Sequence, residues 1–271
     1  MTGPLVFGFA TLLALAGGGA WAWRHSLRQD PSLGPALVFV CLPLAGAVAA
    51  LAMLVEGQWD SGFGAAVWLS VIFSLIVYLL SILLSPESRR LGSLLFAYLF
   101  ILAAVASLWP VTSSSSGGYP TGAWFLVHIV PSLATYALAT LAAIAGVAVL
   151  VQETALKRRT RPPLSQRLPS IADGERLEAR YLLAAEIVLG LGIITGMALS
   201  LTETGELLRF DHKTVLTFLA FILIGLLLVL QSRSGLRGKR LGRLVLLCYL
   251  LLTLAYPGVK FVSDVLLTAP A

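Results

Sequence analysis

Two of the three histidines lie near the start of a long apolar segment, where an imidazole ring has a chemical use. His128 lies near the start of the apolar segment GAWFLVHIVPSLATYALATLAAIAG, and His212 lies in RFDHKTVLTFLAF, close before another apolar run. A neutral imidazole is a good axial ligand for haem iron, and two facing rings form a bis-histidine site. The alternative is that both histidines are interfacial residues, because a ring with an apolar body and a polar tip is stable at such a boundary.

Further candidates for the same site follow from spacing. His128, Ser132 and Tyr136 are spaced i, i+4 and i+8, and we expect one helical face to carry all three. Tyr136 is therefore a second candidate for cofactor binding. Pro131 removes a backbone hydrogen bond at the level of the histidine.

The charged residues around His212 have functional and structural interpretations. Asp211 is well placed to cap the following helix by accepting from its first amides, and we favour that role. Lys213 either reaches the lipid headgroups or pairs with a ligand carboxylate such as a haem propionate. Arg209 is a second candidate partner for a propionate.

Three more ionisable residues lie within or beside apolar segments. Glu186 falls inside a predicted span, where ionisable groups are functional candidates, but we favour a structural pairing with Arg180 or a neighbouring loop arginine. Lys260 and Asp264 are spaced i, i+4 beyond the sequence YPG and form either a surface ion pair or a polar site.

The elements that hold these residues are predicted transmembrane helices. Of 271 residues, 58% are hydrophobic and 12% are charged, whereas a soluble domain has about a quarter charged residues. A span needs about 20 apolar residues. Eight segments qualify: 5–23, 33–55, 63–84, 91–109, 123–151, 181–201, 215–230 and 241 to about 267. The last span either ends or kinks at Pro257.

These segments predict an all-α, polytopic transmembrane bundle in a bacterial inner membrane. Sixteen of the nineteen Lys and Arg residues fall in one set of loops, which the positive-inside rule assigns to the cytoplasm. Eight spans then leave both termini on the outer, periplasmic side. We expect a three-span part, residues 1–90, and a five-span part, residues 91–271, in one structural unit.

Several functions are disfavoured by the same pattern. The basic residues follow membrane topology, so the expected partner is the lipid bilayer and not nucleic acid. The chain has no phosphate-binding loop, nucleophile elbow or zinc-ligand spacing, and we therefore expect no enzyme activity.

Four stretches, HIVPSLATYAL, GMALSL, FDHKTVLTFLAF and SRSGLRGKRLGRLVLLCYLLLTLAYPGVKFV, resemble the cytochrome c assembly membrane family. The resemblance runs from about residue 91 to 267 and is closest to YpjD-like members. In the family, a histidine before an SYA-like stretch ligates haem on the outer side, and the resemblance puts His128 and Tyr136 at that position. It also implies haem as the cofactor.

The sequence departs from the family in its outer loop. FDHKT stands where the family has a run of Trp-Asp-Pro-Lys-Glu-Thr, so His212 replaces the proline and the tryptophans are missing. The second outer histidine after the last span is also missing, and His212 is our candidate to replace it as a ligand. Two hypotheses follow: a haem-binding or haem-handling membrane protein, and a non-haem accessory subunit of another membrane complex, for example a transporter.

Overall fold

Every regular element in the described part of the chain is helical, which confirms the predicted all-α bundle. The computed structural model describes residues 3–26, 33–55, 63–108, 123–205, 212–235, 238–254 and 258. Its α-helices are α1 (Gly3–His25), α2 (Leu33–Val55), α3 (Phe63–Leu84), α4 (Gly92–Leu108), α5 (Ala123–Lys157), α6 (Ile171–Thr204), α7 (His212–Ser234) and α8 (Lys239–Thr253). Two short 3₁₀ helices, η1 (Pro86–Leu91) and η2 (Ser165–Arg167), lie in the connections.

The helices α1 to α7 provide seven segments that are long and apolar enough to cross a membrane. The eighth predicted span is represented by α8, which has 15 residues up to Thr253. Pro257, Lys260 and Asp264 lie outside the described residues. The chain is therefore a multi-pass membrane protein.

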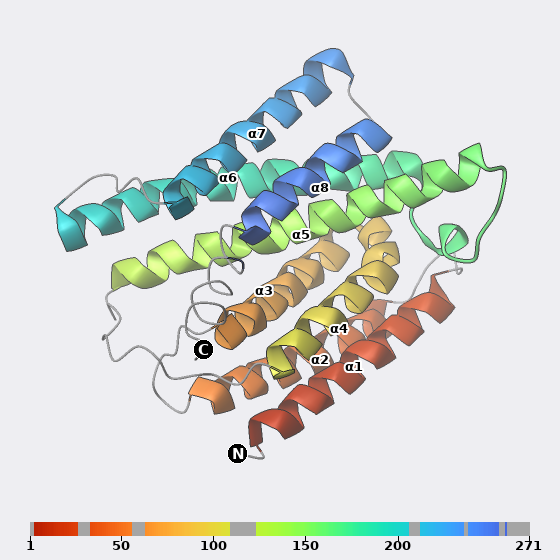
Figure 1. Ribbon diagram of the computed structural model, residues 1–271. Helices are drawn as coiled ribbons and strands as arrows, with labels where there is room; N and C mark the ends of the chain where they lie inside the picture. The colour runs from red at the N-terminus through yellow and green to blue at the C-terminus, as the bar shows by residue number, and fades with distance from the viewer. Residues whose placement is uncertain are drawn as a thin grey trace, which may run out of the picture.

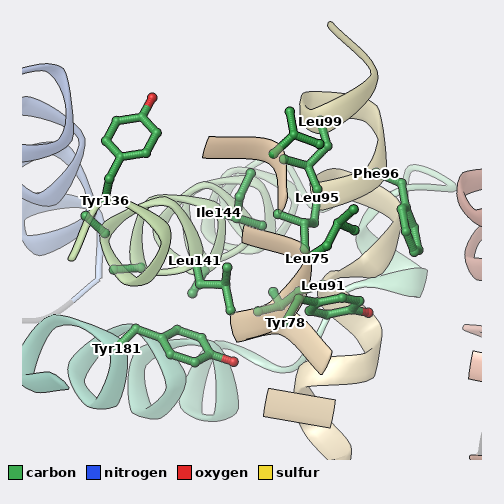
Figure 2. Packing of buried hydrophobic residues seen from close by; sticks show 14 of the residues in the cluster. Leu75, Tyr78, Leu91, Leu95, Phe96, Leu99, Tyr136, Leu141, Ile144 and Tyr181 are labelled. Atoms are coloured by element: carbon green, nitrogen blue, oxygen red, sulfur yellow. The ribbon is translucent and has the colours of Figure 1, made fainter. Parts of the chain in front are cut away.

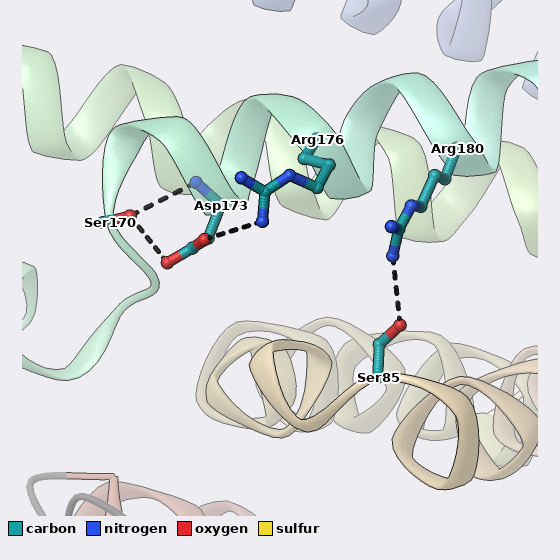
Figure 3. Close-up of polar contacts among 5 residues, drawn as sticks. All are labelled: Ser85, Ser170, Asp173, Arg176 and Arg180. Atoms are coloured by element: carbon teal, nitrogen blue, oxygen red, sulfur yellow. Dashed lines mark hydrogen bonds and ion pairs between the residues drawn. The ribbon is translucent and has the colours of Figure 1, made fainter.

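Helix α6 begins ten residues earlier than the apolar run predicts. Ser170 caps its N-terminus by accepting from the Asp173 amide at 3.2 Å, and Arg176 pairs with the Asp173 carboxylate at 3.3 Å (Figure 3). At 1.5 Å per residue, α6 is about 50 Å long, whereas the hydrocarbon core is about 30 Å thick. The N-terminal turns of α6 and the C-terminal turns of α5 therefore extend past the core, where charged side chains can reach water.

Helices α3 and α5 connect the two halves of the bundle. Helix α1 packs against α2 and α4, and α3 contacts α2, α4 and α5 (Figure 1). Helix α5 also packs against α6 and α8, and α7 closes the second half against those same two helices. Residues on both sides of position 91 thus share one packed core, and the division at that position stays a prediction.

The core is made of apolar side chains at close helix crossings. Leucines of α3, α4 and α5 interdigitate in its centre, among them Leu75, Leu95 and Leu141 (Figure 2). Between α1 and α2, a Cβ on Gly46 would lie 2.6 Å from the Thr11 hydroxyl oxygen, so only glycine permits this approach. Such contacts matter because helices in lipid associate through close packing at small residues.

The basic segments gather at one end of the bundle, which we call the basic end. Arg167, in the α5–α6 connection, donates to the Trp23 carbonyl of α1 at 2.8 Å and stacks over the Trp23 ring at 4.1 Å. Arg180 of α6 donates to Ser85, between α3 and η1, at 3.4 Å (Figure 3). These contacts place the ends of α1, α3 and α5 together. The assignment of this end to the cytoplasm stays a prediction.

Three tyrosines from helices of both halves form a polar cluster where the halves of the bundle meet, which we call the tyrosine cluster. Tyr249 of α8 donates to the Tyr136 hydroxyl of α5 at 3.0 Å, and Tyr98 of α4 hydrogen-bonds Tyr249. Thr140 donates to the Tyr249 hydroxyl at 3.2 Å. The hydroxyl groups thus satisfy one another away from water and join α4, α5 and α8.

We expect Tyr249→Phe and Tyr98→Phe each to destabilise the protein by about 1 kcal/mol, because interhelical hydrogen bonds in membranes are individually weak. The double variant should lose less than the sum of the two, since the single changes remove a shared bond. Thermal unfolding in detergent measures all three values. Strictly additive losses would show that the two hydroxyls do not act together.

Candidate functional site

His128 lies near the start of α5, and its ring rests against α6. The Nδ1 atom is 3.2 Å from the Gly192 carbonyl oxygen and 3.4 Å from the Thr195 hydroxyl oxygen. A Cβ on Gly196 would approach the ring carbon Cε1 to 2.8 Å. Two glycines four residues apart, with Thr195 between them, therefore form a seat for the imidazole, which we call the histidine seat.

The histidine seat selects the tautomer of the His128 ring that carries its hydrogen on Nδ1. A carbonyl oxygen only accepts, so the contact with Gly192 requires hydrogen on Nδ1 of His128. The Thr195 hydroxyl donates to carbonyls of its own helix, at 3.0 Å to Leu191, and its lone pairs remain able to accept from Nδ1. Nε2 then keeps its lone pair. Histidines that bind metals are oriented in this way, by donation from the other ring nitrogen to a carbonyl.

The predicted common face holds for His128 and Ser132 but not for Tyr136. The Ser132 hydroxyl oxygen lies 4.0 Å from the Cβ position of Gly192 and thus faces α6. Tyr136 is buried and hydrogen-bonded to Tyr98 of α4 and Tyr249 of α8 in the tyrosine cluster. Its ring lies on the side of α5 away from Tyr181 of α6 (Figure 2). Eight residues advance an α-helix by about 80° beyond two full turns, which is enough to separate the two sides. The structure therefore does not bring Tyr136 together with His128.

The structure describes only the backbone of some of the residues expected to share a haem site with His128. Helix α7 begins at His212, directly after Asp211, and the side chains of His212 and Lys213 are not described. Arg209 and Asp211 lie outside the described residues. The backbone still places His212 at the end of the bundle that holds His128, because the C-terminus of α6 leads into α7 there. A pairing of the two histidines stays a prediction.

The favoured pairing of Glu186 with Arg180 is wrong. Arg180 donates to Ser85 instead, and Glu186 faces α7, where its Oε1 lies 3.0 Å from the Cβ position of Gly225. The physical reason is helical geometry, because residues six positions apart point to different sides of a helix.

Sequence reasoning missed Glu178, which lies inside α6 and is completely buried. It was overlooked because the predicted span began at residue 181, after this residue. The signal that could have revealed it is the capping pattern of Ser170 and Asp173, which marks a helix start upstream.

Within the residues that the structure describes, no group of three His, Cys, Asp or Glu side chains could hold a metal ion. The described part of the site therefore offers a single oriented imidazole. One such ligand suits a metal that arrives in its own macrocycle, as haem iron does, because a bare ion needs several protein ligands.

Comparison with known proteins agrees with the resemblance in the sequence. The family described as cytochrome C assembly protein matches residues 33–267, a range that begins in α2 and contains the histidine seat. A protein of Azospirillum brasilense described as an uncharacterized 28.8 kDa protein in the nifR3-like 5′ region is 40% identical over 272 residues. The alignment covers 98% of this chain and 100% of that protein. The chain belongs to the cytochrome c assembly protein family.

Proposed function

We propose that the protein binds haem at the end of the bundle opposite the basic end, with His128 as an axial ligand. The observation that carries this proposal is the contact of Nδ1 with the Gly192 carbonyl, which leaves Nε2 able to bind iron. The seat of Gly192 and Gly196 holds the ring against α6, so little side-chain freedom is lost on binding. Haem would supply the iron and the porphyrin, and the protein would supply the ligand and its orientation. The role is haem binding or handling without catalysis.

The proposal includes an orientation in a bacterial inner membrane. The basic end carries the arginines that the positive-inside rule assigns to the cytoplasm. His128 then faces the outer side, where the family resemblance also puts its haem ligand. Both termini lie on that side if α8 continues as a full span.

The remaining part of the site would come from the start of α7. His212 is our candidate for the second axial ligand, and Lys213 and Arg209 are candidates for the haem propionates. Its support is the position of the first α7 residue at the same bundle end as His128. A propionate also suits a lysine beside a helix N-terminus, where anions are favoured.

A second candidate function is that of a non-haem accessory subunit. It is favoured by the FDHKT loop, which lacks the tryptophans of the family's haem-facing loop. The α5–α6 connection, with its basic residues at the end of two long helices, would then be the surface that contacts another membrane protein. A transporter is a weaker variant that rests on Glu186 facing Gly225 of α7.

We expect purified protein titrated with haem to give a saturable Soret shift and a six-coordinate, low-spin spectrum. His128→Ala and His212→Ala should each abolish that spectrum, because each removes one axial ligand. His25→Ala is the matched control: His25 stacks on Trp21 near the end of α1, and its loss should leave the spectrum unchanged. Absence of a saturable shift in the wild type would refute haem binding and leave the accessory role.

The histidine seat predicts a second effect on haem affinity. Gly196→Ala places a methyl group 2.8 Å from the His128 ring and should weaken haem binding, by roughly 10- to 100-fold as for other changes around metal-bound histidines. Gly190→Ala is the control on the same helix, because its Cβ meets Phe221 at an acceptable 3.4 Å. Equal affinities of the two variants in a Soret titration would show that the seat does not position the ligand.

A further inference from the structure

Glu178 occupies the crossing of three helices. Its side chain is fully buried, and a Cβ on Gly146 of α5 would lie 2.8 Å from its Oε1. The Cα of Gly242, in α8, is 3.4 Å from the same Cβ position. The carboxyl group therefore fills space that two glycines leave open between α5, α6 and α8.

The carboxyl group has no partner that would stabilise a negative charge. Neither oxygen of Glu178 makes a hydrogen bond, and no Lys or Arg of the described chain pairs with it. Arg240 and Arg243 on α8 are exposed. Arg180, on its own helix, is turned to Ser85.

The donors at the start of α8 are engaged by other carboxylates. The Gly238 amide donates to Glu175 of α6 at 2.8 Å, and the Lys239 amide donates to Glu153 of α5 at 3.1 Å. These two carboxylates neutralise the positive N-terminus of α8. Their own negative charges lie between Glu178 and the basic end, where they disfavour a second negative charge on Glu178.

A bare carboxylate in this position would be buried without compensation, which is strongly unfavourable. A neutral carboxylic acid fits the same space and needs no counter-ion. We propose that Glu178 is a proton-binding site, whose carboxyl group carries a proton in the folded protein at the crossing of α5, α6 and α8.

The ligand of this site is a proton, which binds by a single proton transfer. A carboxylate oxygen of Glu178 takes up one proton from a hydronium ion at the basic end: one O–H bond of the hydronium breaks, one O–H bond forms on the carboxyl group, and a water molecule is left. The neutral group allows Gly146 and Gly242 to stay in contact. Release of the proton would leave an uncompensated charge at the crossing of α5, α6 and α8, which is strongly unfavourable. This site is independent of haem binding.

The test is infrared spectroscopy of the full-length protein in lipid nanodiscs at neutral pH. The difference between wild type and Glu178→Gln should contain the C=O stretch of a protonated carboxylic acid, which shifts to lower frequency in D₂O. Glu175→Gln is the matched control one turn away, and its difference should contain carboxylate stretches, because Glu175 accepts a backbone amide. Loss of carboxylate stretches in Glu178→Gln would overturn the proposal.

A second variant keeps the test decisive if Glu178→Gln does not fold. Gly146→Ala brings a methyl group to 2.8 Å from Oε1 and retains the glutamate. We expect it to shift the carboxylic acid band. A shift of the carboxylate bands alone would show that Glu178 is ionised. Glu186→Gln, measured separately, accounts for any acid band that belongs to Glu186, whose Oε2 is also buried without a partner.

Discussion

The close approach of α5 and α6 is the contact on which the other features of the second half depend. It is maintained by glycines along the length of the pair. A Cβ on Gly174 would lie 2.8 Å from Cγ2 of Val149, and a Cβ on Gly196 would lie 2.8 Å from Cε1 of His128. Helices in lipid gain little from the hydrophobic effect and associate through such close packing. A larger side chain at these positions would separate the helices, and with them the histidine seat and the Glu178 crossing.

At two levels of α8, polar groups are satisfied by neighbouring helices, as lipid requires. The start of α8 is capped by Glu175 and Glu153, which belong to the two helices beside it. Gly238 at this cap has φ +65°, a conformation that L side chains rarely adopt, and glycine also leaves room for Glu153. The tyrosine cluster fixes the same helix further along. Hydrogen bonds therefore hold α8 both at its N-terminus and at Tyr249, although it is the shortest of the α-helices described.

The paired helices carry different chemistry at their two ends. Toward one end, an imidazole is oriented with its Nδ1 engaged, which suits a metal ligand. Toward the basic end, a carboxyl group is enclosed without a counter-ion, which suits a proton. Both groups depend on glycine positions in the neighbouring helix. The proposed haem ligand belongs to the first end, and the proposed proton-binding site belongs to the second.

The sequence by itself determined the class of the protein, its family and seven of the predicted spans, and it proposed His128 as the main candidate residue. Apolar runs longer than the hydrocarbon core fix transmembrane helices because unpaired backbone is costly in lipid, and the motif around His128 identified the family. Helix periodicity separates Tyr136 from His128 and Glu186 from Arg180, but only helix packing decides which neighbouring helix each of these side chains meets. Glu178 escaped notice because its helix starts with charged turns. Only the tertiary structure decided which side chains meet, since the α5–α6 crossing brings Gly196 to His128 and Gly146 to Glu178.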